Sequence, residues 1–206
     1  MRRHEPVPRV ECLVASLIIL CPAVSAWGQP ADHPLPLPKS EVAVTYRIDK
    51  GPTNADAPHK LQLTYSDAGE RVRVDYFRWV EAKAPYLTRI FDRPADRLIT
   101  IYPERKAYTE RATGDAGNPG AFFRNGSTFT RLGDRVIANA RCTEWGVQVP
   151  KGESGDTACV TDDGISLRVA QANPAFPTLT AITIHYGSPP EGFFDPPAGF
   201  RRETSP

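Results

Sequence analysis

The sequence predicts a mainly β protein, an antiparallel curled sheet or half-barrel of about ten strands with one or two short helices. Three observations lead to this prediction. Apolar and polar residues alternate with a period of two along many short segments, as they do in strands with one buried face. Turn residues separate these segments at intervals of about 8–12 residues. The chain of 206 residues also contains 21 prolines, which interrupt long helices.

The first three segments, 41–49, 60–66 and 71–76, alternate most regularly. A shift of one residue in their pairing would turn arginines into the core, so the pattern specifies the register. Six apolar or aromatic residues share the predicted inner face: Val44, Tyr46, Leu63, Tyr65, Val74 and Tyr76. The polar residues between them, such as Arg47 and Arg73, should face outward.

Further segments of the same kind follow toward the C-terminus. They are 86–91, 98–102, 107–110, 129–132, 135–138, 142–149, 156–161, 165–170 and 179–186. Only 77–84 and 120–125 leave room for a short helix, and Pro85 ends the first of these.

The N-terminus resembles a secretory signal peptide. Basic residues come first, at Arg2, Arg3 and Arg9, and an apolar run follows over 13–20. The small residues of Val24-Ser25-Ala26 then predict cleavage after Ala26, and so a periplasmic or secreted mature protein of the bacterial cell envelope. The run is shorter than the roughly 18 residues that span a bilayer, so no stable membrane anchor is expected after cleavage. Lipidation of Cys21 is the less favoured alternative, because Leu20 stands where a lipoprotein signal has a small residue.

These features divide the chain into four parts. Residues 1–26 are the predicted signal peptide, and 27–40 are a proline-rich leader that we expect to be extended and solvated. Residues 41–200 form the β domain. Residues 201–206 are a polar tail.

Two of the four cysteines, Cys142 and Cys159, remain after signal cleavage. In an oxidising compartment such a pair favours a structural disulfide over two free buried thiols. The glycine-rich turn between their strands is not centred for direct pairing of the two positions. We therefore expect a bulge or a diagonal bridge.

Sequence motifs give no support for catalysis, a metal or a cofactor. His33, His59 and His185 have no ligand partner at i+2 or i+4, and Gly152-Glu153-Ser154-Gly155 lacks the frame of a nucleophile elbow. The 25 basic residues nearly balance the 24 acidic ones, which argues against a nucleic-acid partner. The sequence therefore predicts a non-enzymatic protein that needs no cofactor.

The predicted sheet has an apolar face and little helix to cover it. It either curls until its own side chains fill the interior or leaves a concavity for an apolar guest. In the second case Trp145 and Val147, from a later hairpin, are candidates for the wall opposite the six residues of the inner face. The sequence leaves both alternatives open.

Several segments, in order, carry a family resemblance. They are Arg71–Asp75, Arg97–Tyr102, Val136–Trp145, Ala158–Arg168 and Phe194–Phe200. Together they resemble uncharacterised periplasmic domains of the lipoprotein-localisation-factor (LolA/LppX-like) half-barrel superfamily. The sequence departs from that pattern at Asn139-Ala140, where a glycine and an aromatic residue are usual, and at Cys159, where tryptophan is usual.

The resemblance implies a half-barrel with a hydrophobic ligand, a lipid or acyl chain, in its concave face. A structural or interaction domain of the envelope with a filled core is the alternative, and an enzyme with a composite site is a third. The resemblance identifies no protein partner.

Overall fold

The computed structural model describes residues 33–50, 57–114, 122–123, 126–148, 154–173 and 176–204. All of these belong to one compact unit, residues 31–206. The predicted signal peptide and the first part of the leader, up to residue 32, lie outside the described residues.

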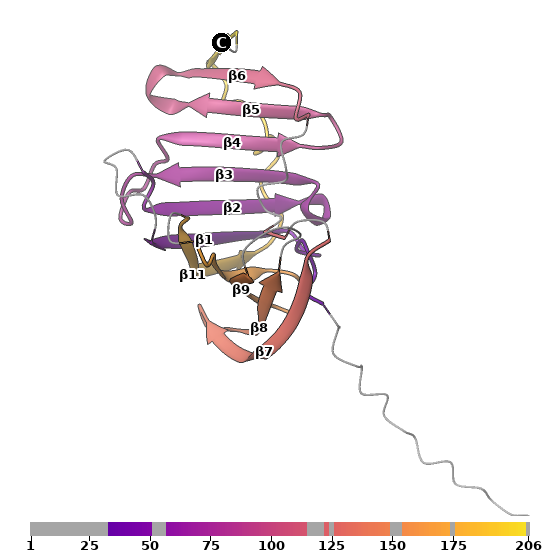
Figure 1. The fold of residues 1–206 in the computed structure, drawn as a ribbon. Helices are drawn as coiled ribbons and strands as arrows, with labels where there is room; N and C mark the ends of the chain where they lie inside the picture. Colours follow the sequence, from indigo (N-terminus) through magenta and orange to yellow (C-terminus); the bar gives the residue numbers. More distant parts are fainter. Residues whose placement is uncertain are drawn as a thin grey trace, which may run out of the picture. The chain divides into compact units, whose positions relative to one another are not determined.

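One sheet of 12 strands contains every strand found in the described residues (Figure 1). The strands are β1 (Val42–Lys50), β2 (Lys60–Ser66), β3 (Arg71–Phe77), β4 (Leu87–Asp92), β5 (Arg97–Tyr102), β6 (Ala107–Arg111), β7 (Thr128–Ile137), β8 (Ala140–Gln148), β9 (Ser154–Val160), β10 (Ser166–Ala170), β11 (Thr178–Tyr186) and β12 (Arg201–Glu203). Within the described residues the helical elements are two single 3-10 turns, η1 (Asp67–Gly69) and η2 (Pro103–Arg105).

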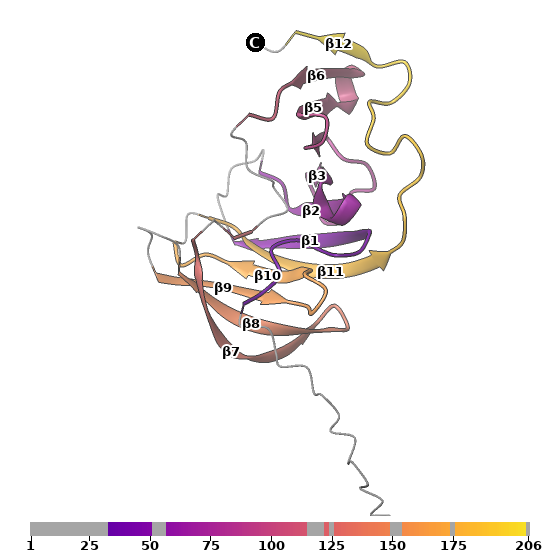
Figure 2. The same cartoon turned by 90° about the vertical axis from the view of Figure 1, so that its right-hand side faces the viewer.

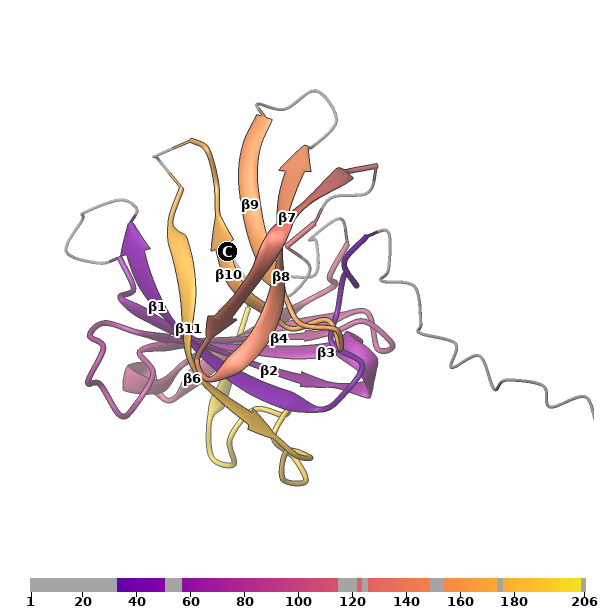
Figure 3. The same cartoon turned by 90° about the horizontal axis from the view of Figure 1, so that it is seen from below.

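The strand order is β12-β6-β5-β4-β3-β2-β1-β11-β10-β9-β8-β7, so β12 and β7 form the two edges. Neighbouring strands are antiparallel except β12, which runs parallel to β6. The strands turn progressively across the sheet, and β7–β9 run steeply across the direction of β1–β4 (Figure 3). The result is an open, curled sheet, as the alternation predicted.

The prediction of about ten strands is slightly low. The expected segments 129–132 and 135–138 are one strand, β7, with a register shift between Arg131 and Gly133. The shift is a bulge, at which Gly133 adopts a φ of 150°. Residues 201–203, expected in a polar tail, form β12.

The helix expected within 77–84 is absent, since β3 extends to Phe77 and bends and turns follow it. The region 120–125 lies mostly outside the described residues.

The inner face of β1–β3 contains the largest group of buried apolar residues, as the period of two predicted. This cluster includes Val42, Val72 and the six residues predicted to share the inner face. Ile165, Leu167 and the two bonded cysteines belong to the same cluster. The β1–β11 pair joins β1–β6 to the later strands, with Val44 opposite Ile184.

The outer face of β3–β6 is covered by the segment between β11 and β12. This segment runs alongside the stack of β1–β6 (Figure 2). Phe194 packs against Ile90, Ile99 and Ile101. Arg73 donates a hydrogen bond of 2.9 Å to the carbonyl of Phe193 and pairs with Asp75 at 3.0 Å. Arg73, which we expected to face outward, does so, but its side chain is only 17% exposed because this segment lies over it.

The second half of the leader packs against the domain, contrary to the expectation that it is solvated. Pro34 and Pro38 are buried, and the amide of Lys39 donates a hydrogen bond of 2.9 Å to the carbonyl of Asp163. Leu37 lies between two turns at Gly69 and Gly164. A Cβ at Gly69 would be 3.0 Å from the Leu37 side chain, and one at Gly164 would be 2.3 Å from the Leu37 carbonyl oxygen. The two glycines leave the space that this segment occupies.

Candidate functional site

The six residues predicted to line a cavity do lie together on the inner face. Val44 and Tyr46 are 0% exposed, and Leu63, Tyr65 and Val74 are 2% exposed. Tyr76 is half-buried at the margin of the same cluster. The Tyr46 hydroxyl donates a hydrogen bond of 2.9 Å to the carbonyl of Ser166, which belongs to β10 across the curl. Burial raises the pKa of Tyr46 and of Tyr65 above the usual value.

Trp145 and Val147, the candidates for the opposite wall, lie in a different cluster. They are 6% exposed each and pack with Ala158 and Val160, against Phe123 and Phe129. The structure therefore brings six of the eight residues together and places the other two apart. Because the inner-face residues already pack against the chain itself, their burial favours the filled-core alternative. An acyl ligand at this face stays a prediction.

The disulfide prediction agrees with the structure. Cys142 and Cys159 are bonded, with Cα atoms 5.4 Å apart. The residue opposite Cys159 is Glu144, so the bridge runs diagonally between β8 and β9, as expected from the turn. This bond joins β8 to β9 close to the turn that ends the β7–β8 hairpin.

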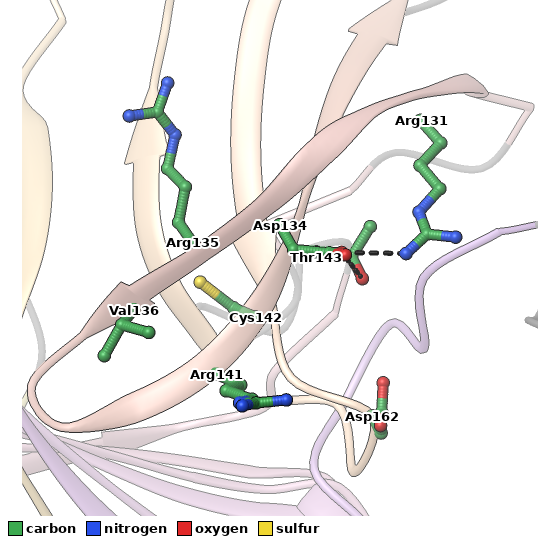
Figure 4. Close-up of a pocket in the computed structure, with 8 residues that line it drawn as sticks. All are labelled: Arg131, Asp134, Arg135, Val136, Arg141, Cys142, Thr143 and Asp162. Atoms are coloured by element: carbon green, nitrogen blue, oxygen red, sulfur yellow. Dashed lines mark hydrogen bonds and ion pairs between the residues drawn. The ribbon is translucent and has the colours of Figure 1, made fainter.

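A pocket of about 500 Å³ lies on the β7–β8 hairpin (Figure 4). It is lined by Arg131, Asp134, Arg135, Val136, Arg141, Cys142, Thr143 and Asp162. The hairpin ends in a two-residue turn, with Ala138 at φ 49° and Asn139 at φ 61°. Positive φ at both central residues belongs to the type I′ turn, whose twist matches that of paired strands.

Strand pairing places the lining residues on the two faces of the hairpin. Asp134 lies opposite Thr143 and Val136 lies opposite Arg141, so these four share one face, the pocket face. Arg135 lies opposite Cys142 and extends from the other face (Figure 4). There its Nε atom pairs with Glu144 at 2.7 Å.

Most charges on the hairpin are already paired. Arg131 forms an ion pair of 2.8 Å with Asp134, and the Thr143 hydroxyl donates to the same carboxylate at 3.2 Å. These contacts, the Arg131 hydrogen bond foremost, lower the pKa of Asp134, and the charge of Arg141 adds to the effect. Glu144 accepts from Arg135 and lies 4.0 Å from Arg168.

Arg141 and Asp162 are different. Both are exposed, and neither has an ion pair or hydrogen bond with another residue in the described ranges. Arg141 comes from β8, and Asp162 from the turn between β9 and β10. The pocket thus offers one guanidinium group and one carboxylate that form no ion pair or hydrogen bond within the described part of the chain, although the charge of Arg141 acts on Asp134.

The pocket borders an edge of the sheet. Among the described residues, β7 pairs with β8 alone and is the last strand of the sheet. Two large apolar side chains on this strand are exposed, Leu132 at 55% and Val136 at 67%. Val136 lies on the pocket face. Leu132 lies on the other face, over Gly146, where a Cβ would be 3.7 Å from the Leu132 side chain.

Sequence reasoning missed this site. It divided β7 into two short strands and assigned no role to its arginines, because strand order is not visible in a local pattern. The exposure of Leu132 and Val136 becomes visible only in the structure.

Two further properties concern the described part of the chain only. No three His, Cys, Asp or Glu side chains there gather into a group that could hold a metal ion. No helix there is long and apolar enough to cross a membrane.

Comparison with family models and with curated proteins found no match. Among solved structures, an uncharacterized conserved protein from Thermus thermophilus is similar, with a TM-score of 0.53 and 7% identity over 81% of this chain and 91% of that chain. PNGF-II is similar with a TM-score of 0.44 and 9% identity, over 81% of this chain and 32% of that chain. MucB in the Pseudomonas aeruginosa MucA/MucB complex is similar with a TM-score of 0.46 and 9% identity, over 78% of this chain and 56% of that chain. At these identities the Thermus protein supports the fold alone, and the function rests on this chain's own residues.

Proposed function

We propose that this protein is a non-catalytic interaction domain of the cell envelope, and that the free edge of β7 binds an extended segment of a protein partner. The observation that carries the proposal is the β7 edge itself, ten residues long and, among the described strands, paired on one side only. An unpaired edge offers main-chain donors and acceptors to an added strand.

The positions of the exposed β7 side chains favour an added strand over a partner that packs against only one face of β7. Val136 and Leu132 are exposed on opposite faces of the strand. A partner that covered one face would leave the other residue in water. An added strand lies beside both faces at once, so its own side chains can shield both residues.

The rest of the domain suits a rigid support for such an edge. The inner-face residues are buried, and the diagonal disulfide joins β8, the neighbour of β7, to β9. Export to the envelope is the part of this proposal that rests on the signal-like sequence of residues 1–26.

Selection from a phage-displayed library of random nine-residue peptides on the mature protein, residues 27–206, tests the proposal. We expect enriched peptides with apolar residues at alternate positions. In the double variant L132K/V136K their affinity should fall at least tenfold, because two charges then flank the edge. The matched control is Trp79→Lys, which adds a charge at another exposed apolar residue, 58% exposed and distant in strand order.

The same preparations should be titrated with a fluorescent fatty-acid analogue. Binding of the analogue, with no peptide enriched, would overturn the proposal in favour of an apolar ligand. Peptides that bind the double variant as well as the wild type would also overturn it, since the β7 edge would then not be the binding surface.

A further inference from the structure

We infer that the segment which pairs with β7 is acidic, and that Arg141 binds its carboxylate across Val136. This inference rests on the proposed function and names the chemistry of the partner. Two observations carry it: Arg141, opposite Val136, makes no ion pair with the described residues, and β7 itself has a net positive charge.

Strand geometry places Arg141 within reach of such a partner. Arg141 lies directly opposite Val136, and an added strand would lie on the other side of Val136. Adjacent strands are about 4.8 Å apart, so Arg141 and the added strand are separated by about 10 Å. An arginine and a glutamate side chain together span that distance when both lie over the methyl groups of Val136.

The other arginines of the pocket have partners. Arg131 is held by Asp134, and Arg135 by Glu144. A carboxylate from outside would have to compete with these ion pairs. Arg141 makes no ion pair or hydrogen bond with the described residues, so a new carboxylate can bind it without breaking an existing contact there.

The same charges limit where the acidic residue can stand. Asp134 is on the pocket face, two residues from Val136 along β7. A second carboxylate opposite Asp134 would be repelled. We therefore expect one acidic residue at the level of Val136 and a neutral or basic residue at the level of Asp134.

A second copy of this chain is a poorer occupant of the edge. β7 itself carries two arginines, Arg131 and Arg135, and one aspartate, Asp134, so the strand has a net positive charge. Two copies paired through β7 about a two-fold axis would bring two net positive strands together. The charge balance favours a different, acidic chain.

The test uses the peptides enriched on the mature protein. Each is synthesised with its acidic residue as Glu, Gln or Lys, and the Kd values are measured by fluorescence anisotropy at low and at high salt. With the wild type, the Glu form should bind about three- to fivefold more tightly than the Gln form at low salt, as expected for one exposed ion pair, and salt should reduce the difference.

Three variants complete the design. Arg141→Glu should reverse the order and favour the Lys form, while Arg141→Lys should keep the preference for Glu. Arg111→Glu is the matched control, because Arg111 is an exposed arginine of β6 with no ion pair among the described residues, and it should leave the preference unchanged.

The outcomes separate the two proposals. Equal Kd values for the Glu and Gln forms, or an enriched set without acidic residues, would overturn the inference while the proposed function stands. If no peptide is enriched at all, both the proposed function and this inference are overturned. A dimer of the mature protein that forms through β7, detected by light scattering and lost in L132K/V136K, would replace the acidic partner by a second copy.

Discussion

The hydroxyl of Tyr46 in β1 donates a hydrogen bond of 2.9 Å to the main-chain carbonyl of Ser166 in β10. The two strands are separated by β11 in the sheet, so this bond crosses the inside of the curl. Both residues are buried, Tyr46 at 0% and Ser166 at 5% exposed. The contact therefore holds two parts of the sheet that do not pair with each other.

Removing the Tyr46 hydroxyl should destabilise the fold without changing its shape. We expect Tyr46→Phe to lower the free energy of unfolding by about 1–2 kcal/mol, because the Ser166 carbonyl loses its donor in a dry environment. Urea denaturation at neutral pH measures the change. Tyr186→Phe is the control, since Tyr186 is 58% exposed and its bond to Asp163 is in contact with water. Equal effects of the two variants would contradict the prediction.

Stability should also decline at alkaline pH. Burial raises the folded-state pKa of Tyr46 and Tyr65 above 10.0, their ordinary value. The stabilisation is complete below the unfolded pKa of about 10 and is lost as the pH rises above it toward the folded-state pKa values. Each tyrosine should contribute about 1.4 kcal/mol of loss per pH unit in that range. Urea denaturation between pH 8 and 11 measures it, with tyrosinate absorbance followed in parallel. A free energy of unfolding that stays constant over this pH range would contradict the burial of the Tyr46 and Tyr65 hydroxyls.

The diagonal disulfide should contribute substantially to stability. The bond between Cys142 and Cys159, with a sequence separation of 17, closes a loop that the chain-entropy estimate values at about 3 kcal/mol. We expect the double variant C142S/C159S to lose about that much in urea denaturation. Thiol titration of the unfolded, non-reduced mature protein should detect no free cysteine. Two reactive thiols would show that the bond does not form in solution.

The contact between Leu37 and Gly164 predicts that the leader can be displaced by one methyl group. A Cβ at Gly164 would be 2.3 Å from the Leu37 carbonyl oxygen, and the φ of 93° there disfavours any side chain. Gly164→Ala should therefore free residues 34–39 and raise their hydrogen exchange. Gly192→Ala is the control, because it has a φ of 73° but no neighbour within 4 Å of its Cβ position. If both variants leave exchange at Lys39 unchanged, the leader does not depend on this close approach.

The sequence predicted those parts of the fold that one strand determines alone. In β1–β3 each inward residue is apolar and each outward residue is mostly polar, so alternation was sufficient. It was not sufficient for β12, because Arg201 and Arg202 are polar and the strand is held by main-chain pairing with β6. The packing of Leu37 was also missed, since its contacts are turns distant in sequence.

The candidate site depends on such long-range relationships throughout. Arg141 has an ordinary polar sequence environment, and its lack of a partner among the described residues is visible only when the ion pairs of Arg131 and Arg135 are known. The β7 edge likewise follows from the order of all the strands. Periodicity predicts on which face of a strand a residue lies, but it does not predict which strands are neighbours in the sheet.

The pairing of β1 with β11 has a consequence for how the protein folds. Val42, at the start of the first strand, lies opposite Tyr186, at the end of the eleventh. β1 therefore lacks one of its two neighbours until nearly the whole chain is present. Strand pairs so distant in sequence form slowly, because a long loop must close before any contact compensates for the lost entropy. A chain emerging N-terminus first would hold an incomplete sheet with an open β1 edge, and a helper that shields this edge would be of most use in that interval.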